Sequence, residues 1–175
     1  MFGFRCSMFV FRCSEKRIDT EKRKYKPKHR TSNNVHRKTN MYHYNHPYRV
    51  RYADTDQMGY VYYGNYARLY EIGRVEALRS LGFSYKEMEV SGIMMPVYEN
   101  KSRYIAPALY DELLTIRTTI KTIPAARIVF HYEIFNNSNL LVHTGETTLV
   151  FVKMENNRLT LAPKGLLEKL NEFFS

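Results

Sequence analysis

The chain has 175 residues, of which 44% are hydrophobic and 25% are charged, and its formal net charge is +10. This length allows one folded domain with a buried core, and no apolar run is long enough to cross a bilayer. A charge of this size would favour nucleic acid or an anionic membrane as partner only if it were spread over the fold. Residues 1–40 carry +9 of the charge and residues 41–175 carry +1, so we expect no nucleic-acid partner for the domain.

Both cysteines lie in the basic N-terminal segment. Cys6 and Cys13 belong to a repeated Phe-Arg-Cys-Ser sequence, and the rest of the chain has no cysteine. Disulfides and cysteine-zinc sites therefore cannot hold the domain together, and a reducing cytoplasm is the expected location. The segment is a poor signal peptide because Arg5 and Arg12 interrupt its only apolar stretch.

Residues 15–46 are polar, basic and nearly free of aliphatic side chains, which predicts disorder. We therefore divide the chain into a basic extension over 1–46 and a domain over 47–175 that starts near Tyr48. The extension could be an arm that binds nucleic acid or acidic lipid. A solvated tail, or a true start of translation at Met41, is the more ordinary interpretation.

A strand, a turn and a long helix are predicted at the start of the domain. Strand-like alternation over 48–52 gives way to turn residues over 54–59. From Tyr66 onward the apolar or small residues recur with the spacing of a helix buried along one side. These residues are Tyr66, Leu69, Tyr70, Gly73, Ala77, Leu78 and Leu81. Gly82 is a natural end for this helix, and the charged residues fall largely on its other side.

A short second helix is predicted over 85–90, with Ser84 as its N-cap. Beyond Gly92 the hydrophobic period changes to two. Apolar and polar residues alternate over 113–123 and over 127–135, which predicts half-buried antiparallel strands.

Turn residues between these strands predict short hairpin connections. They lie at Pro124, at 136–139 and at 155–157, and a terminal helix is predicted over 164–173. One early helix followed by a meander of long strands indicates an α+β fold, in which a curved antiparallel five-stranded sheet wraps around a long central helix.

The segment that joins the first strand to the long helix carries the candidate chemistry. It places two aspartates, Asp54 and Asp56, just before a helix whose first N–H groups have no partner within the helix. A carboxylate and such N–H groups suit a reaction at a carbonyl. We expect only one of the two aspartates to act, rather than a pair that shares one proton.

The chain resembles the hotdog-fold acyl-CoA thioesterases of the 4-hydroxybenzoyl-CoA thioesterase-like family, from about Tyr48 to the C-terminus. The resemblance rests on the motif Asp-Thr-Asp-x-x-Gly over 54–59 and, beyond it, on Val61, Tyr66, Glu71 and Arg74. Two further stretches, Met-Pro-Val over 95–97 and the segment 105–113, are also usual in such domains.

This resemblance implies the hotdog fold and hydrolysis of a thioester to a free acid and coenzyme A. It further implies that the enzyme needs no metal and no cofactor, and that it works as a homodimer or homotetramer with sites at the subunit interfaces. The thioester carrier could be coenzyme A or an acyl carrier protein. The rival hypothesis is a non-catalytic hotdog module that binds either ligand.

The resemblance assigns catalysis to Asp56, as nucleophile or as the base that activates water. It also assigns polarisation of the thioester carbonyl to the backbone N–H of Tyr63. We expect Tyr63, Gly64 and Asn65 to form the first helical turn, with Gly64 allowing a ligand to come close. Gly59 should supply a positive φ for the turn. The alternative is that the aspartates only satisfy loop or helix N–H groups.

The substrate-binding candidates begin with the loop aromatics. Side chains near Val61 could line an acyl tunnel, although aromatics on a helix more often belong to the core. They are Tyr60, Tyr62, Tyr63, Tyr66 and Tyr70. Glu71 is a second carboxylate candidate, but we favour an ion pair with Arg68 or Arg74.

Lys121 and Arg127 flank the turn at Pro124 and could contact the phosphates of coenzyme A. They could equally be solvent-facing ends of strands. His131 and His143 lie in alternating strands, where an ordinary sheet histidine is the more common outcome than a group in the cleft.

Overall fold

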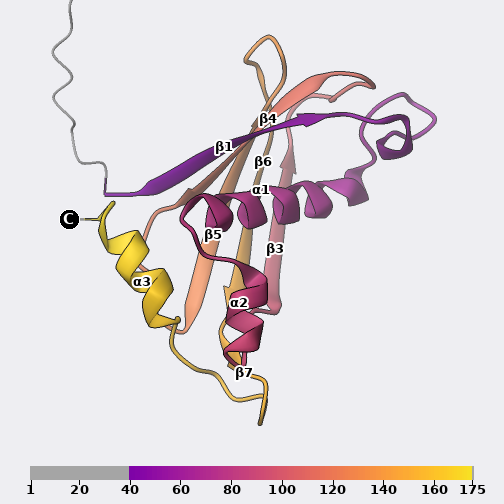
Figure 1. Ribbon diagram of the computed structural model, residues 1–175. Helices are drawn as coiled ribbons and strands as arrows, with labels where there is room; N and C mark the ends of the chain where they lie inside the picture. The colour runs from indigo at the N-terminus through magenta and orange to yellow at the C-terminus, as the bar shows by residue number, and fades with distance from the viewer. Residues whose placement is uncertain (1–39, 175) are drawn as a thin grey trace, which may run out of the picture. The chain divides into compact units, whose positions relative to one another are not determined.

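The structure is a computed structural model and describes residues 40–174. Along this part of the chain the elements are β1 (Tyr42–Arg49), α1 (Tyr66–Ser80), α2 (Tyr85–Val90), β2 (Ile93–Met94), β3 (Val97–Tyr104), β4 (Leu113–Ile120), β5 (Arg127–Phe135), β6 (Leu141–Val150), β7 (Val152–Lys153) and α3 (Lys164–Asn171). The five long strands form one antiparallel sheet in the order β1-β4-β5-β6-β3, and α1 lies across one face of it (Figure 1). The predicted α+β hotdog fold is confirmed.

The alternation of side chains along the strands decides which face of the sheet meets the helix. In β5 the apolar side chains of Ile128, Phe130 and Ile134 are fully buried, whereas His131 and Glu133 between them are partly exposed. Strand β4 repeats the pattern and pairs antiparallel with β5. The period-two prediction therefore gives the inner and outer faces correctly.

Helix α1 buries the predicted side chains and lies very close to β4. A Cβ atom at Gly73 would come within 2.8 Å of the Ile116 side chain and 2.6 Å of the Thr118 hydroxyl, so only glycine fits there. The expectation that charged residues lie on the other side of this helix is wrong for Arg74, whose side chain is buried. The reason is a tertiary contact, because the Nε of Arg74 donates a hydrogen bond to the Tyr85 hydroxyl at 3.2 Å.

The end of α1 and the start of α2 have the residues that helix ends prefer. Gly82 has a φ of +67° directly after α1, as its predicted role at the helix end requires. Ser84 caps α2: its side chain accepts a hydrogen bond from the N–H of Glu87, whose carboxylate accepts one from the N–H of Ser84.

The predicted disorder of residues 42–46 is wrong, because β1 already begins at Tyr42. Tyr42 and Tyr44 alternate with polar residues, and the tyrosines face α1. The hydroxyl of Tyr42 donates a hydrogen bond to the carbonyl of Ala77 at 2.7 Å, so aromatic rings supply the burial that aliphatic side chains would otherwise give. The rest of the basic extension, with Cys6 and Cys13, lies outside the described residues.

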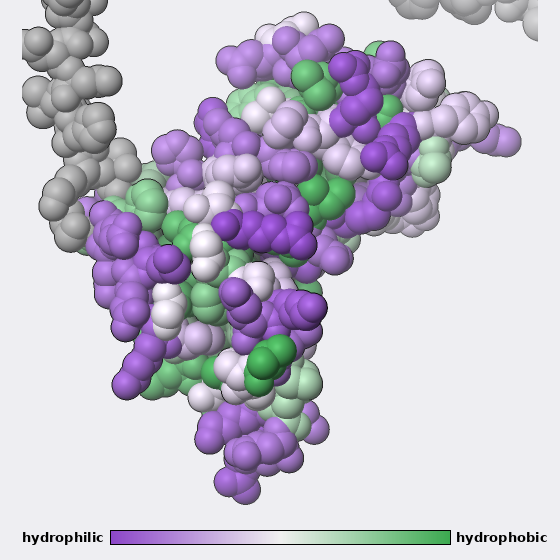
Figure 2. Space-filling model, viewed as in Figure 1, coloured by the Kyte–Doolittle hydropathy of each residue, from purple (hydrophilic) through white to green (hydrophobic). Residues whose placement is uncertain are grey.

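Figure 2 shows that the face seen in Figure 1 is mostly hydrophilic and that its hydrophobic residues form separate patches. Over residues 40–174, no helix has the length and the apolar character that a membrane crossing needs.

Candidate active site

The segment between β1 and α1 folds back on itself and places Asp56 at a turn. Thr55 and Val61 form an isolated antiparallel bridge, and the N–H of Asp56 donates to the carbonyl of Tyr60 at 2.9 Å. The N–H of Gly59 donates to the carbonyl of Asp56 at 3.0 Å. Gly59 has a φ of +76°, which confirms its predicted role in the turn.

The Asp56 carboxylate is half-buried and only partly used by the loop. Its Oδ1 accepts a hydrogen bond from the N–H of Met58 at 2.9 Å, which is the ordinary role of an aspartate in a turn. Its Oδ2 has no hydrogen-bond partner among residues 40–174. One carboxylate oxygen is therefore free to face a substrate or a water molecule.

The predicted first helical turn is present as a 3₁₀ turn, Tyr63–Asn65, that runs directly into α1. The N–H of Tyr62 donates to the carbonyl of Asp54, and the N–H of Asn65 donates to the carbonyl of Tyr62, both at 2.9 Å. In the described part of the chain, the N–H groups of Tyr63 and Gly64 donate no hydrogen bond. These two groups, at the positive end of the helix, suit an oxygen that gains negative charge.

Tyr62 directly precedes the 3₁₀ turn, and its ring centroid lies 4.4 Å from that of Tyr63. The pKa of its phenol is raised, first by the neighbouring Tyr63 phenol and further by the charge of Asp56. The ring of Tyr62 also covers Gly64, because a Cβ atom at Gly64 would lie 2.7 Å from the Cε1 of Tyr62. The space beside Gly64 in which we expect a ligand is thus filled by the Tyr62 ring, which is 42% exposed.

An apolar groove of about 300 Å³ opens beside this loop. Tyr60, Val61 and Tyr66 line one side, and residues 104–107 at the end of β3 line the other. The hydroxyl of Tyr104 donates a hydrogen bond to the carbonyl of Tyr63 at 3.3 Å, so the groove adjoins the helix start. No sequence pattern identifies Tyr104 as a site residue, because nothing local predicts that the end of a strand meets the loop 41 residues earlier.

A buried histidine supports the aromatic wall of the groove. The Tyr66 ring stacks on the His143 ring with centroids 3.9 Å apart, and Tyr104 meets it edge-on at 4.8 Å. His143 shares a hydrogen bond with the Tyr70 hydroxyl through Nε2, whereas its Nδ1 has no partner in the described region. Burial lowers the pKa of His143 to about 4, so the ring is neutral at physiological pH. Tyr70 itself stacks on Tyr132 in the core and is not part of the groove.

Asp54 has different surroundings from Asp56 and is only 2% exposed. Its Oδ2 accepts hydrogen bonds from the Tyr48 hydroxyl at 2.7 Å and from the N–H of Arg51 at 2.8 Å. Its Oδ1 forms an ion pair with Arg68 of α1. Both carboxylate oxygens of Asp54 therefore have partners within the protein, whereas among residues 40–174 only one oxygen of Asp56 has a partner.

The favoured interpretation of Glu71, an ion pair with Arg68 or Arg74, is wrong. Arg68 pairs with Asp54, and Arg74 turns inward to Tyr85. Glu71 is exposed, and no ion pair involves it within the described residues. Its side chain instead helps to line a cleft of about 280 Å³ between α1 and β3, together with both arginines.

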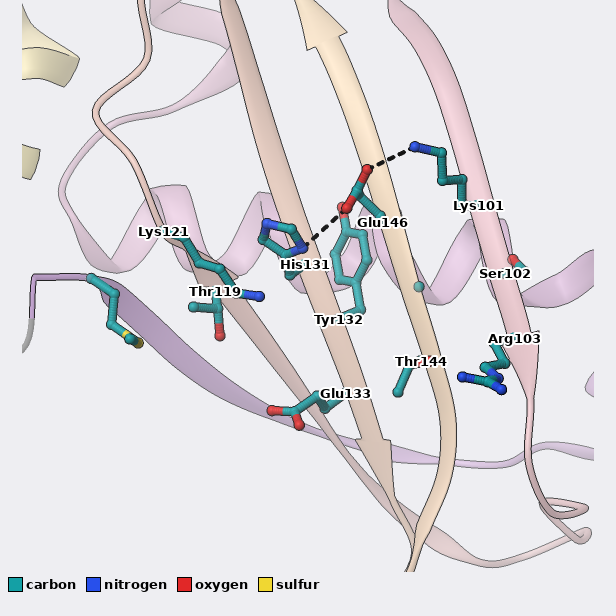
Figure 3. A pocket seen from close by; sticks show the side chains of 12 residues that line it. Lys101, Ser102, Arg103, Thr119, Lys121, His131, Tyr132, Glu133, Thr144 and Glu146 are labelled. Atoms are coloured by element: carbon teal, nitrogen blue, oxygen red, sulfur yellow. Dashed lines mark hydrogen bonds and ion pairs between the residues drawn. The ribbon is translucent and has the colours of Figure 1, made fainter.

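Lys121 and Arg127 lie in different surroundings. Lys121 lines a groove of about 570 Å³ on the outer face of the sheet (Figure 3). A row of polar side chains from β5, β6 and β3 crosses the groove, and it consists of His131, Glu146 and Lys101. The guanidinium of Arg127 lies over the ring of Tyr98, 5.1 Å from its centroid, and is not part of this groove.

The two sheet histidines occupy opposite faces. His131 has its Nδ1 3.3 Å from the Glu146 carboxylate on the outer face, and its pKa is lowered by burial and by Lys121.

Across residues 40–174 there is no group of three or more histidine, cysteine or acidic side chains that could hold a metal ion.

Comparisons with known proteins identify the family of this chain. A profile of the thioesterase-like superfamily matches residues 50–170. The acyl-CoA thioester hydrolase YbgC of Escherichia coli O6:H1 is 32% identical over 126 residues, which cover 72% of this chain and 94% of that protein. The protein YneP of Bacillus subtilis is 40% identical over 87 residues, or 50% of this chain and 63% of its own length.

Among solved structures, the DHNA-CoA thioesterase from Staphylococcus aureus superposes with a TM-score of 0.66 at 35% identity, over 68% of this chain and 80% of that one. The profile match extends from the end of β1 to α3 and includes the whole loop-to-helix site. The chain therefore belongs to the thioesterase-like superfamily, and it is a hotdog-fold hydrolase that acts on thioester bonds.

Proposed function

We propose that this protein hydrolyses acyl-CoA thioesters at the junction between the Asp56 loop and α1. The observation that carries the proposal is that, within residues 40–174, the Oδ2 of Asp56 has no hydrogen-bond partner and lies on the loop that leads directly to the N–H groups of Tyr63 and Gly64, which donate no hydrogen bond there. The names of the Escherichia coli and Staphylococcus aureus relatives support coenzyme A as the thiol carrier.

In this proposal the acyl group lies in the apolar groove beside Tyr60 and Tyr66. The thioester oxygen accepts hydrogen bonds from the N–H groups of Tyr63 and Gly64, which stabilise the negative charge of the tetrahedral intermediate. One such donor contributes about 3 kcal/mol to transition-state stabilisation. Asp56 either attacks the carbonyl carbon or removes a proton from water. In both routes water supplies OH to the acyl carbon and a proton to the sulfur, so the products are a free acid and coenzyme A.

The test is the release of free thiol from a panel of short, long and aromatic acyl-CoAs. Asp56→Asn should lower kcat by roughly 10²- to 10⁴-fold, as expected for loss of a positioned base. Glu155→Gln, an exposed carboxylate change far along the chain, is the matched control and should leave kcat unchanged. Full activity of the Asp56 variant would remove this residue from the mechanism.

The same panel separates the rival hypothesis. Saturable binding of an acyl-CoA by the wild-type protein without turnover would indicate a non-catalytic binding module. Turnover of acyl groups on an acyl carrier protein but not on coenzyme A would keep the reaction and change the carrier.

We further propose that two copies associate through β3. This strand forms one edge of the sheet, and all eight of its residues are exposed, including Val97, Tyr98 and Tyr104. A long exposed edge with apolar side chains is a template for pairing with another strand. Sedimentation analysis should give the mass of a dimer or tetramer, and a monomer at assay concentration would refute the pairing.

A further inference from the structure

Asp54 is a buried carboxylate that the proposed reaction does not use. A buried charge is costly unless it is paired and hydrogen-bonded, and Asp54 meets this condition with three donors from three places in the chain. Tyr48 lies in β1, Arg51 follows that strand, and Arg68 is in the first turn of α1. One side chain therefore ties the sheet, the loop and the helix together.

The backbone of Asp54 adds two more connections to the same helix start. Its carbonyl accepts hydrogen bonds from the N–H of Tyr62 and from the side-chain amide of Asn65, both at 2.9 Å. The Arg68 guanidinium also donates to the Tyr48 hydroxyl at 3.1 Å, so the partners of Asp54 hold one another. Such a network fixes geometry more strongly than one isolated bond.

The positions of these contacts relative to the reacting groups are specific. Asp54 lies two residues before Asp56, and its carbonyl holds the N–H that immediately precedes the N–H of Tyr63. The contacts thus fix the chain on both sides of the space in which the thioester carbonyl would lie. Catalysis depends on this separation, because a displacement of about 1 Å can cost roughly 100-fold in rate.

We propose that Asp54 is a positioning residue, which holds the Asp56 carboxylate and the N–H groups of Tyr63 and Gly64 at their working separation. This inference rests on the proposed function. It assigns the two aspartates of one motif to separate tasks, Asp56 to the chemistry and Asp54 to the geometry. It also gives Arg68 a role in the site that its place on the exposed side of α1 does not suggest.

The experiment compares Asp54→Asn, Arg68→Met and the matched control Glu76→Gln. Glu76 pairs with Arg79 on the same helix but away from the loop, so its variant removes a carboxylate–arginine pair without touching the site. We expect Asp54→Asn to lower kcat by about 10- to 100-fold and to change KM by less than about threefold. Arg68→Met should have a smaller effect of the same kind, because this ion pair is half exposed. Glu76→Gln should match the wild type.

Two readouts exclude a merely structural role. All rates are measured well below each variant's unfolding temperature, so that the folded fraction is equal, and wild-type kcat in Asp54→Asn under this condition would overturn the proposal. The second readout is the division of the effect between kcat and KM. A tenfold rise in KM with unchanged kcat would mean that Asp54 acts on substrate binding, and it would also overturn the proposal.

Amide hydrogen exchange over residues 55–64 tests the tether without any turnover. Exchange there should be faster in Asp54→Asn than in Glu76→Gln, and equal exchange would overturn the proposal. If the wild-type protein hydrolysed no thioester, the proposed function would fail, and the exchange measurement would still decide whether Asp54 holds the loop to the helix.

Discussion

Replacing His143 by glutamine should remove a large part of the acid sensitivity of this fold. The ring is completely buried, and burial lowers its pKa to about 4 from an ordinary value of 6.5. Between these two pH values the unfolded chain binds a proton that the folded protein excludes. The stabilisation is therefore fully present above pH 6.5 and is lost as the pH falls towards 4. A difference of about 2.5 pH units at 1.36 kcal/mol each corresponds to about 3 kcal/mol.

The groups around His143 should not disturb this measurement. Its neighbours are the phenols of Tyr66, Tyr70 and Tyr104, and burial raises the pKa of Tyr66 and of Tyr70 to about 12, far above this pH range. The free energy of unfolding is obtained from urea denaturation at pH 4, 5, 6 and 7, followed by circular dichroism because the chain has no tryptophan.

The informative quantity is the wild-type value minus the His143→Gln value at each pH, since the difference cancels all other titrating groups. We expect it to fall by about 3 kcal/mol from pH 7 to pH 4. A pH-independent difference, or an NMR titration of His143 near 6.5 in the folded protein, would refute the reasoning.

Three further changes test the site. Gly64→Ala should lower kcat by about tenfold, because the new methyl group meets the Tyr62 ring. The double variant with Tyr62→Ala should regain most of the rate, and no recovery would place the ligand itself in that space. Glu71→Gln should change the free energy of unfolding by less than about 0.5 kcal/mol and kcat by less than about threefold, because the carboxylate has no ion pair in the described chain. A thousandfold loss of kcat would instead make Glu71 the reacting carboxylate. Lys121→Met should raise KM roughly threefold for acyl-CoA and leave KM unchanged for acyl-pantetheine, which lacks the nucleotide phosphates. Arg127 lies over Tyr98, so Arg127→Met should change neither KM, and equal effects of Lys121→Met on both substrates would argue against a phosphate contact.

The local sequence pattern predicts most of the fold, because the relevant physics is local. Period-two alternation in β4 and β5 and the helical period in α1 each give the buried face correctly. The turn at Gly59 and the cap at Ser84 are likewise properties of a few neighbouring residues. The predicted strand over 48–52 begins later than β1, which starts at Tyr42. The burial of β1 comes from tyrosines that contact α1, as in the hydrogen bond from Tyr42 to Ala77, 35 residues away.

The sequence by itself determined that a carboxylate loop precedes a long helix under a sheet, and that this chain resembles thioesterases. Only the tertiary structure decided the roles within that loop. Asp54 and Asp56 are the same residue type two positions apart, and their difference lies in which donors reach them from β1 and α1. Glu71 likewise has neither of its predicted partners, because Arg68 pairs with Asp54 and Arg74 donates to Tyr85. Burial and ion pairing of a polar side chain depend on long-range contacts, and these form only when the sheet closes on the helix.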